Sequence, residues 1–250
     1  MNTPKSRVYH RLAPFRDWFR EGLPILTYHK LGAPARGAKL KGLYARERMF
    51  DKQLRELHEA GFSSGSLDEV ASGVVKAKCV VITFDDAYVN VLRHGLEPLA
   101  RYKFQAMQYV VADAIGGSNH WDVKWGEAAE PLMDKAQLRE WLAAGHGIGS
   151  HTSSHVNLAK VPIEKAREEI RASKQKLEDL LGIPVRHFCY PYGGWNAAVR
   201  DLVAEAGYET ATTLDFGLNT PATPKLELKR LMARHQSWGL KAIRARFFGK

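Results

Sequence analysis

The stretch VITFDDAY, residues 81–88, runs from four strand-forming residues directly into two adjacent carboxylates, Asp85 and Asp86. A short apolar run rich in β-branched and aromatic residues is typical of a strand buried on both faces. Taken alone, an Asp pair after a strand is typical of a turn or a helix start, because its side chains accept backbone N–H groups there. The rest of the chain decides whether the pair has a further role.

Strand-like runs alternate with helical patterns on both sides of this stretch. Helical spacing of apolar residues predicts long helices between most of the runs, and a final helix ending near residue 248. Strands separated by such helices predict the α/β class with a mainly parallel sheet. About seven units suit a closed or nearly closed (β/α) barrel. The strand-like runs are 23–29, 79–84, 106–112, 146–152, 187–194, 208–214 and 226–234.

Length and composition narrow the class of protein. With 250 residues, 45% hydrophobic and 26% charged, the chain has enough apolar surface for a substantial core, which excludes a disordered protein. The sequence has no apolar run of membrane-spanning length, and its first residues lack the apolar segment of a secretory signal, so we expect a cytoplasmic protein. Cys79 and Cys189 lie in apolar runs and are expected to be small core residues rather than a disulfide pair.

The positive charge is concentrated at the start of the chain. The first 50 residues carry a net charge of +8 out of +10, and within residues 1–22 arginines are interleaved with aromatic residues. Two interpretations stay open: this arm lies on an anionic membrane surface, peripheral at the inner face, or it packs its aromatic side chains against the main domain. No recognition motif accompanies the charge, so we expect no nucleic-acid partner. We therefore divide the chain into an arm, 1–22, and a domain, 23–250.

Three groups of polar residues follow three of the predicted strands. In (β/α) barrels the active site is built from loops at the carboxyl ends of the strands, so Asp85 and Asp86, His151 and His155, and Tyr192 should meet at one face. The motif HTSSH separates two imidazoles by four residues, which on a helical turn aims both at a common point. On its own, such a pair of histidines is more often a coincidence or a capped helix start than a pair of metal ligands. A carboxylate from another strand would complete a set of three ligands that can hold a metal and leave coordination positions open for water and substrate.

The motifs TFDD, HTSSH and RHFCYPYGG occur in the order and at the separations of the first three motifs of a known family. The sequence resembles the polysaccharide deacetylases, which carry the NodB homology domain and form carbohydrate esterase family 4, and the resemblance extends over residues 23–248. It implies a distorted (β/α) barrel and the metal-dependent hydrolytic removal of an acetyl group from an N-acetylated sugar.

The resemblance also implies roles for the paired carboxylates and the histidines. Asp86, His151 and His155 would bind a divalent metal, and Asp85 would be the general base that activates a water on it. Adjacent carboxylates repel each other, and a cation offsets that repulsion. Zn²⁺ is the expected metal for this set, while Co²⁺, Ni²⁺ or Mn²⁺ would satisfy the same ligands.

The remaining site residues rest on weaker matches. By the resemblance, Arg186 would contact the base, a backbone N–H near Tyr192 would bind the oxyanion, and His235 would be the general acid. The alternatives are an ordinary glycine turn at YPYGG and a surface histidine at 235. Asp215 would either orient such a histidine or only form a turn. Ala87 departs from the glycine that the family usually has after the two aspartates, which would tighten the local loop.

The sequence thus predicts an N-deacetylase acting on an N-acetylhexosamine unit of a bacterial glycan or lipid-linked saccharide. Two alternatives are a deformylase or other C–N hydrolase acting on a non-sugar amide, and a glycan-binding barrel without catalysis. Intact acidic and histidine motifs argue against the second alternative. Four tryptophans are candidates for stacking on sugar rings, or else for core and rim packing: Trp121, Trp125, Trp195 and Trp238.

Overall fold

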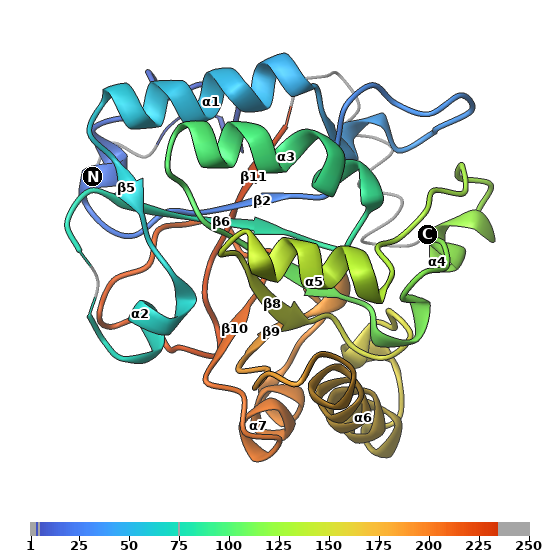
Figure 1. Ribbon diagram of the computed structural model, residues 1–250. Helices are drawn as coiled ribbons and strands as arrows, with labels where there is room; N and C mark the ends of the chain where they lie inside the picture. The colour runs from blue at the N-terminus through green and yellow to red at the C-terminus, as the bar shows by residue number, and fades with distance from the viewer. Residues whose placement is uncertain (1–3, 5, 75, 235–250) are drawn as a thin grey trace.

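The computed structural model describes residues 4, 6–74 and 76–234, and shows a curved parallel sheet surrounded by helices (Figure 1). The nine-stranded sheet has the order β1-β11-β2-β6-β7-β8-β9-β10, with β5 paired to β6. The predicted α/β barrel-like class is confirmed, and each of the seven predicted strands appears. The strands of this sheet are β1 (Val8–Tyr9), β2 (Ile25–Tyr28), β5 (Ser63–Ser64), β6 (Cys79–Phe84), β7 (Ala106–Val110), β8 (Gly147–Ser150), β9 (His187–Cys189), β10 (Thr210–Thr212) and β11 (Leu231–Ala233).

Strand β6 lies in the middle of the sheet and carries the opening stretch of the sequence. Every residue of β6 is buried, because the strand is paired on both edges and covered on both faces. Thr83 is in register with Thr27 of β2 and Met107 of β7. A continuous apolar run is what a central parallel strand requires. The two aspartates therefore leave the sheet at its carboxyl edge.

Helices cover the outer side of the sheet (Figure 1). Helix α1 packs on α3, α3 on α5, α5 on α6 and α6 on α7, so the helices follow the curve of the strands. Helix α6 begins after Pro162 and ends at Gly182, whose φ of 71° forms a left-handed cap. The helices are α1 (Glu47–Glu59), α2 (Leu67–Ala71), α3 (Val89–Arg101), α4 (His120–Val123), α5 (Lys135–Ala143), α6 (Ile163–Leu181) and α7 (Ala197–Glu205).

The N-terminal arm packs against the rest of the chain. Strand β1 pairs in parallel with β11, and the rings of Tyr9, Phe15 and Phe19 are buried in the main core. The backbone N–H of Leu12 donates to the carboxylate of Glu56 on α1, at 2.7 Å. The structure thus shows the second interpretation of the arm, in which its aromatic side chains pack against the main domain. The arginines of the arm stay exposed: Arg7, Arg11, Arg16 and Arg20.

Several short elements were not predicted. Strands β3 (Lys30–Leu31) and β4 (Tyr44–Ala45) form a separate pair, and α2 begins with a capping box in which Ser66 and Glu69 bond each other's backbone N–H groups. The S-x-x-E spacing in the sequence is the signal that would have found α2. Both cysteines are buried and unbridged, as expected. The final helix expected near residue 248 lies outside the described residues.

None of the described helices combines the length and apolar character needed to span a membrane. The remaining short elements are single 3-10 turns. The 3-10 turns are Trp18–Arg20, Lys41–Leu43, Ala112–Ala114, Leu158–Lys160 and Pro191–Gly193.

Candidate active site

Three of the predicted site residues converge at the carboxyl edge of the sheet. Asp86 follows β6, and His151 and His155 follow β8. Asp86 Oδ1 lies 3.2 Å from His155 Nε2 and 3.6 Å from His151 Nε2, and all three side chains are buried. One donor atom from each of the three lies within 4.8 Å of the others. The structure therefore brings together the three residues that were predicted as metal ligands.

The outward nitrogens of both imidazoles are occupied, which fixes how the rings face Asp86. His151 Nδ1 lies 2.8 Å from the carbonyl oxygen of Cys189, and His155 Nδ1 lies 3.0 Å from the hydroxyl of Tyr192. A carbonyl can only accept, so His151 carries its proton on Nδ1 and points an Nε2 lone pair inward. Such partners on the outer nitrogen are typical of metal-binding histidines.

The charge balance around Asp86 fits a cation. Burial, together with the neighbouring His155, lowers the pKa of His151 to about 4, so the His151 imidazole is neutral at pH 7. Burial opposes ionisation of Asp86, but the imidazoles of His155, His29 and His151 outweigh it and hold its pKa below the usual range. Apart from these imidazoles, no hydrogen-bond partner of the Asp86 oxygens is found among the described residues. A buried carboxylate whose nearest partners are two imidazoles is an arrangement that a divalent metal would satisfy.

Asp85 has different surroundings from its neighbour Asp86. Its oxygens accept two hydrogen bonds from Arg230, at 2.7 and 2.8 Å, and His29 Nε2 lies 3.8 Å away. Burial would raise the pKa of Asp85, but the Arg230 guanidinium, helped by His29, lowers it. Arg230 is itself buried, and it also donates to Thr83 Oγ1 and to the carbonyl of Thr213. Asp85 is therefore held ionised and in one orientation.

The prediction that Arg186 contacts the base is wrong. Its side chain is 48% exposed, and it pairs on the surface with Asp68 and Glu209, each at 3.4 Å. Arg186 lies just before β9 and its side chain points outward, whereas Arg230, just before β11, points into the barrel. Sequence reasoning missed Arg230 because no local signal in LKRLMAR separates a buried arginine from the exposed basic residues beside it.

The YPYGG turn contributes a side chain to the site. Tyr192 has a φ of 59°, and its hydroxyl lies against His155. A Cβ at Gly194 would lie 2.1 Å from Asn157 Oδ1, so a larger residue there would displace the Asn157 side chain. Binding of an oxyanion by a backbone N–H near Tyr192 stays a prediction. The general acid proposed at His235 lies outside the described residues.

Positive φ values occur in all three site loops. Asp86, Ala87, Thr152, His155 and Tyr192 have φ between 59° and 77°, in the left-handed region that favours glycine. Each such residue costs on the order of 1–2 kcal/mol, and such strain concentrates at functional sites. Ala87 therefore occupies a position whose backbone conformation favours glycine. This agrees with the glycine that the resemblance led us to expect there.

The remaining candidates have varied surroundings. Trp121 is buried and stacks on the His155 ring, with centroids 4.4 Å apart, so it packs against the site rather than offering an open sugar platform. Trp125 is 76% exposed, and Trp195 stacks on Tyr190. Trp238 lies outside the described residues. Asp215 is an exposed turn residue whose backbone carbonyl accepts from the N–H of Arg230.

Comparison with known proteins identifies relatives. Residues 72–211 match the polysaccharide deacetylase family. The chain is 23% identical to the poly-beta-1,6-N-acetyl-D-glucosamine N-deacetylase of Escherichia coli K12, over 81% of this chain and 35% of that protein. It is 29% identical to the peptidoglycan-N-acetylglucosamine deacetylase of Bacillus cereus, over 53% of this chain and 55% of that protein. The chain thus spans about one third to one half of the length of these curated relatives.

A solved structure agrees with the fold. The Streptococcus pyogenes deacetylase PplD, in complex with acetate, superposes with a TM-score of 0.72 at 23% identity. The match covers 85% of this chain and 92% of that one. At this level of identity the match supports the barrel-like fold alone.

Proposed function

This chain belongs to the polysaccharide deacetylase family, and on that premise we propose that it hydrolyses the N-acetyl group of an N-acetylhexosamine unit in a glycan. The observation that carries the proposal is the difference between two adjacent carboxylates. Asp86 faces two imidazoles and no other described hydrogen-bond partner, and Asp85 is held by Arg230. One is suited to bind a cation, and the other is suited to accept a proton next to it.

Asp86, His151 and His155 would hold the cation, for which Zn²⁺ is the expected ion, while Co²⁺, Ni²⁺ or Mn²⁺ would satisfy the same ligands. When bound, a divalent metal supplies Lewis acidity to the water and to the amide carbonyl. The tautomer of His151, fixed by the carbonyl of Cys189, keeps its Nε2 available as a ligand. The Tyr192 hydroxyl keeps the His155 ring in place.

Asp85 takes the proton of the attacking water as the water oxygen bonds to the acetyl carbon. The C–N bond then breaks, releasing acetate, and the sugar nitrogen leaves as a free amine after gaining a proton. Arg230 keeps Asp85 ionised before the attack, and its two hydrogen bonds fix the direction of the carboxylate. His235 stays the predicted donor of the proton to the amine.

The carrier of the sugar and the place of action are part of the same proposal. A lipid-linked saccharide at the inner membrane face would suit the exposed arginines of the N-terminal arm, which would meet anionic headgroups. The arm's buried aromatic rings would take no part in that contact.

The direct test is acetate release, measured by mass spectrometry, from N-acetylglucosamine oligomers with β-1,4 and β-1,6 linkages and from peptidoglycan fragments. We expect release by the zinc-loaded protein and none after chelation. An N-formyl amide in the same assay tests the deformylase alternative. Intact substrates across the whole panel with zinc-loaded protein would contradict the proposal.

A further inference from the structure

The loop between the two histidines has a strained backbone. Residues 151–155 contain two non-glycine residues in the left-handed region, Thr152 at φ 68° and His155 at φ 59°. Within the loop, the described hydrogen bond runs from the His155 N–H to Thr152 Oγ1, at 3.0 Å. Strained backbone of this kind persists only where the surroundings determine it. The support must come from outside the loop.

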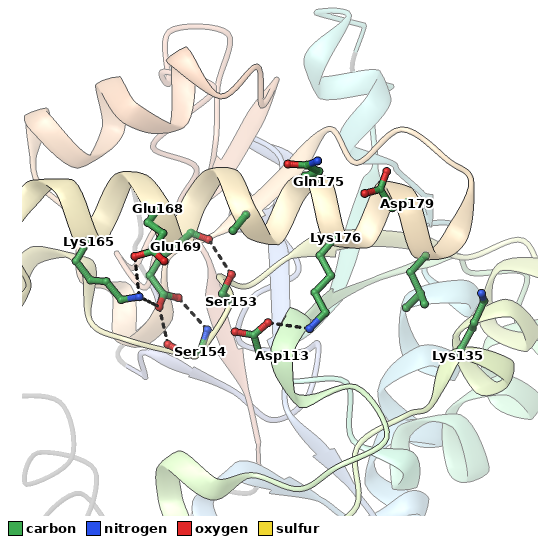
Figure 2. Close-up of a pocket in the computed structure, with 12 residues that line it drawn as sticks. Asp113, Lys135, Ser153, Ser154, Lys165, Glu168, Glu169, Gln175, Lys176 and Asp179 are labelled. Atoms are coloured by element: carbon green, nitrogen blue, oxygen red, sulfur yellow. Dashed lines mark hydrogen bonds and ion pairs between the residues drawn. The ribbon is translucent and has the colours of Figure 1, made fainter.

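The backbone N–H groups of Ala112 and Asp113 donate to the carbonyls of Thr152 and Ser153. Helix α6 supplies further support through Glu169 and Ser173, and Figure 2 shows the contact of Glu169. Ser154, the residue before His155, donates from its backbone N–H and its hydroxyl to the two carboxylate oxygens of Glu169, at 2.8 and 2.6 Å. Ser150, the residue before His151, donates to Ser173 Oγ at 2.8 Å. Residues 169 and 173 are four apart and lie on one face of α6. The residue before each histidine is therefore bonded to the same helix.

The carboxylate of Glu169 is buried, and its oxygens are bonded to Ser154. It is 1% exposed although it belongs to a helix with a charged outer face, and a buried carboxylate is tolerated only when its oxygens are bonded. Both oxygens accept from Ser154, and Lys165 Nζ lies 3.3 Å away. The contact borders a polar groove of about 640 Å³ on the outer side of the loop, where Figure 2 shows Glu169 turned toward Ser154.

The neighbouring Glu168 provides a matched comparison. Its side chain is 66% exposed, and the partner described for it is Lys165, at 3.0 Å. It lines the same groove on the same turn of α6 but makes no described bond to the loop. Changing Glu168 alters the charge of the groove, whereas changing Glu169 alters both the charge and the loop.

We propose that Glu169 is a positioning residue that holds His151 and His155 as a preformed ligand pair by bonding Ser154. The inference rests on the proposed metal site and adds to it a residue that touches neither substrate nor metal. Partners of metal ligands contribute about 10- to 100-fold to metal affinity, and Glu169 acts one step further out, through the backbone. The expected effect of its loss is therefore about 10-fold in metal affinity, at the lower end of that range.

The test measures Zn²⁺ binding to the metal-free protein by competition with a chelating dye, apart from any assay of deacetylation. Glu169→Gln keeps the size of the side chain but leaves only one acceptor oxygen, so we expect the Zn²⁺ Kd to rise about 10-fold. Glu168→Gln should bind Zn²⁺ with the wild-type Kd. Activity of Glu169→Gln should fall at limiting Zn²⁺ and return at saturating Zn²⁺ with an unchanged KM, which a general loss of structure would not produce.

Ser154→Ala keeps the test decisive if Glu169→Gln does not fold, because Ser154 is only half-buried and retains its backbone N–H. It should weaken Zn²⁺ binding less than Glu169→Gln does, and the double variant should bind no more weakly than Glu169→Gln alone. Wild-type Kd values in both single variants would overturn the inference. Absence of Zn²⁺ binding to the wild-type protein would overturn the proposed function, and this inference with it.

Discussion

Two buried carboxylates in this protein have opposite surroundings. Glu130 accepts hydrogen bonds from Lys30 Nζ at 2.6 Å, from Asn90 Nδ2 at 3.0 Å and from the hydroxyl of Tyr44, and the Lys30 side chain is completely buried. Asp86 is more deeply buried, at 1% exposed against 9% for Glu130, and faces two imidazoles but no other hydrogen-bond partner among the described residues.

The difference separates a structural carboxylate from a functional one. Where the chain supplies its own cation, as Lys30 does for Glu130, the group is satisfied without a ligand and serves the fold. Where the chain supplies two imidazoles and no Lys or Arg, the carboxylate and the imidazoles together can hold a cation from outside. Disturbing the two clusters should therefore change different properties of the protein.

The largest effect is expected from Asp86→Asn. Zn²⁺ binds the folded state and should therefore raise the unfolding temperature of the wild-type protein. At a free Zn²⁺ concentration of a thousand times the Kd, the gain in unfolding free energy should be about 4 kcal/mol. Asp86→Asn should abolish both this response and acetate release. Calorimetry of each protein with and without Zn²⁺ measures the response. A variant that still gains stability from Zn²⁺ would show that the cation binds elsewhere.

Asp85→Asn should leave Zn²⁺ binding intact and lower kcat by about 10²- to 10⁴-fold, the contribution of a general base. The change also leaves the buried Arg230 without its partner, so Asp85→Asn/Arg230→Met serves as the control for lost stability. Acetate release at saturating Zn²⁺ gives the rate. Near wild-type turnover in either variant would exclude Asp85 as the base.

Lys30→Met should disturb the Glu130 cluster and leave the Asp86 cluster unchanged. It leaves Glu130 buried without its cation, which costs about 3–5 kcal/mol of unfolding free energy, while the gain from Zn²⁺ stays as in the wild type. Urea unfolding with and without Zn²⁺ measures both quantities, and the exposed Lys41→Met is the control. Loss of the Zn²⁺ response in Lys30→Met would mean that the two clusters are not independent.

A smaller effect, on the pH dependence of stability, is expected from His146, which belongs to neither the Asp86 cluster nor the Glu130 cluster. It is buried against Trp141, and burial lowers its pKa to about 4. The unfolded chain, with a pKa near 6.5, then binds more protons between pH 6.5 and 4, so stability should fall as the pH drops through that window. His146→Gln should remove up to about 3 kcal/mol of this fall. Urea unfolding at pH 7 and pH 4.5 checks it, and an unchanged slope would contradict the assignment.

The smallest effect is expected from Ala87→Gly. Relief of a φ of 62° is worth about 1–2 kcal/mol, and the added freedom of glycine in the unfolded chain takes back about 0.4–1 kcal/mol. The net gain in stability should stay near 1 kcal/mol, with the Zn²⁺ Kd unchanged. A loss of stability in thermal unfolding would show that the left-handed conformation is not strained.

The sequence predicted those features of the fold that depend on periodicity. The run 79–84 became β6 without change, and α6, Ile163–Leu181, is one of the long helices expected between the strand-like runs. Short pairings such as β1 with β11 could not be predicted, because two-residue strands leave no periodic pattern. The arm's packing depends on contacts with distant residues such as Glu56.

The same distinction holds for the site. Asp86, His151 and His155 could be placed because each lies at or shortly after the carboxyl end of a predicted strand, and parallel strands end at one edge. Arg230 could not, because it precedes its strand and reaches Asp85 through the barrel interior. Glu169 is one of many acidic residues along α6, and only its burial distinguishes it from Glu168.

The most direct test of the cation site is an anomalous difference map from crystals of the metal-free protein soaked in Zn²⁺. The account predicts a peak about 2.0–2.2 Å from Asp86 Oδ1 and from the Nε2 atoms of His151 and His155, and none at Glu130. An empty position between these three side chains, with Zn²⁺ bound only at exposed carboxylates, would contradict it.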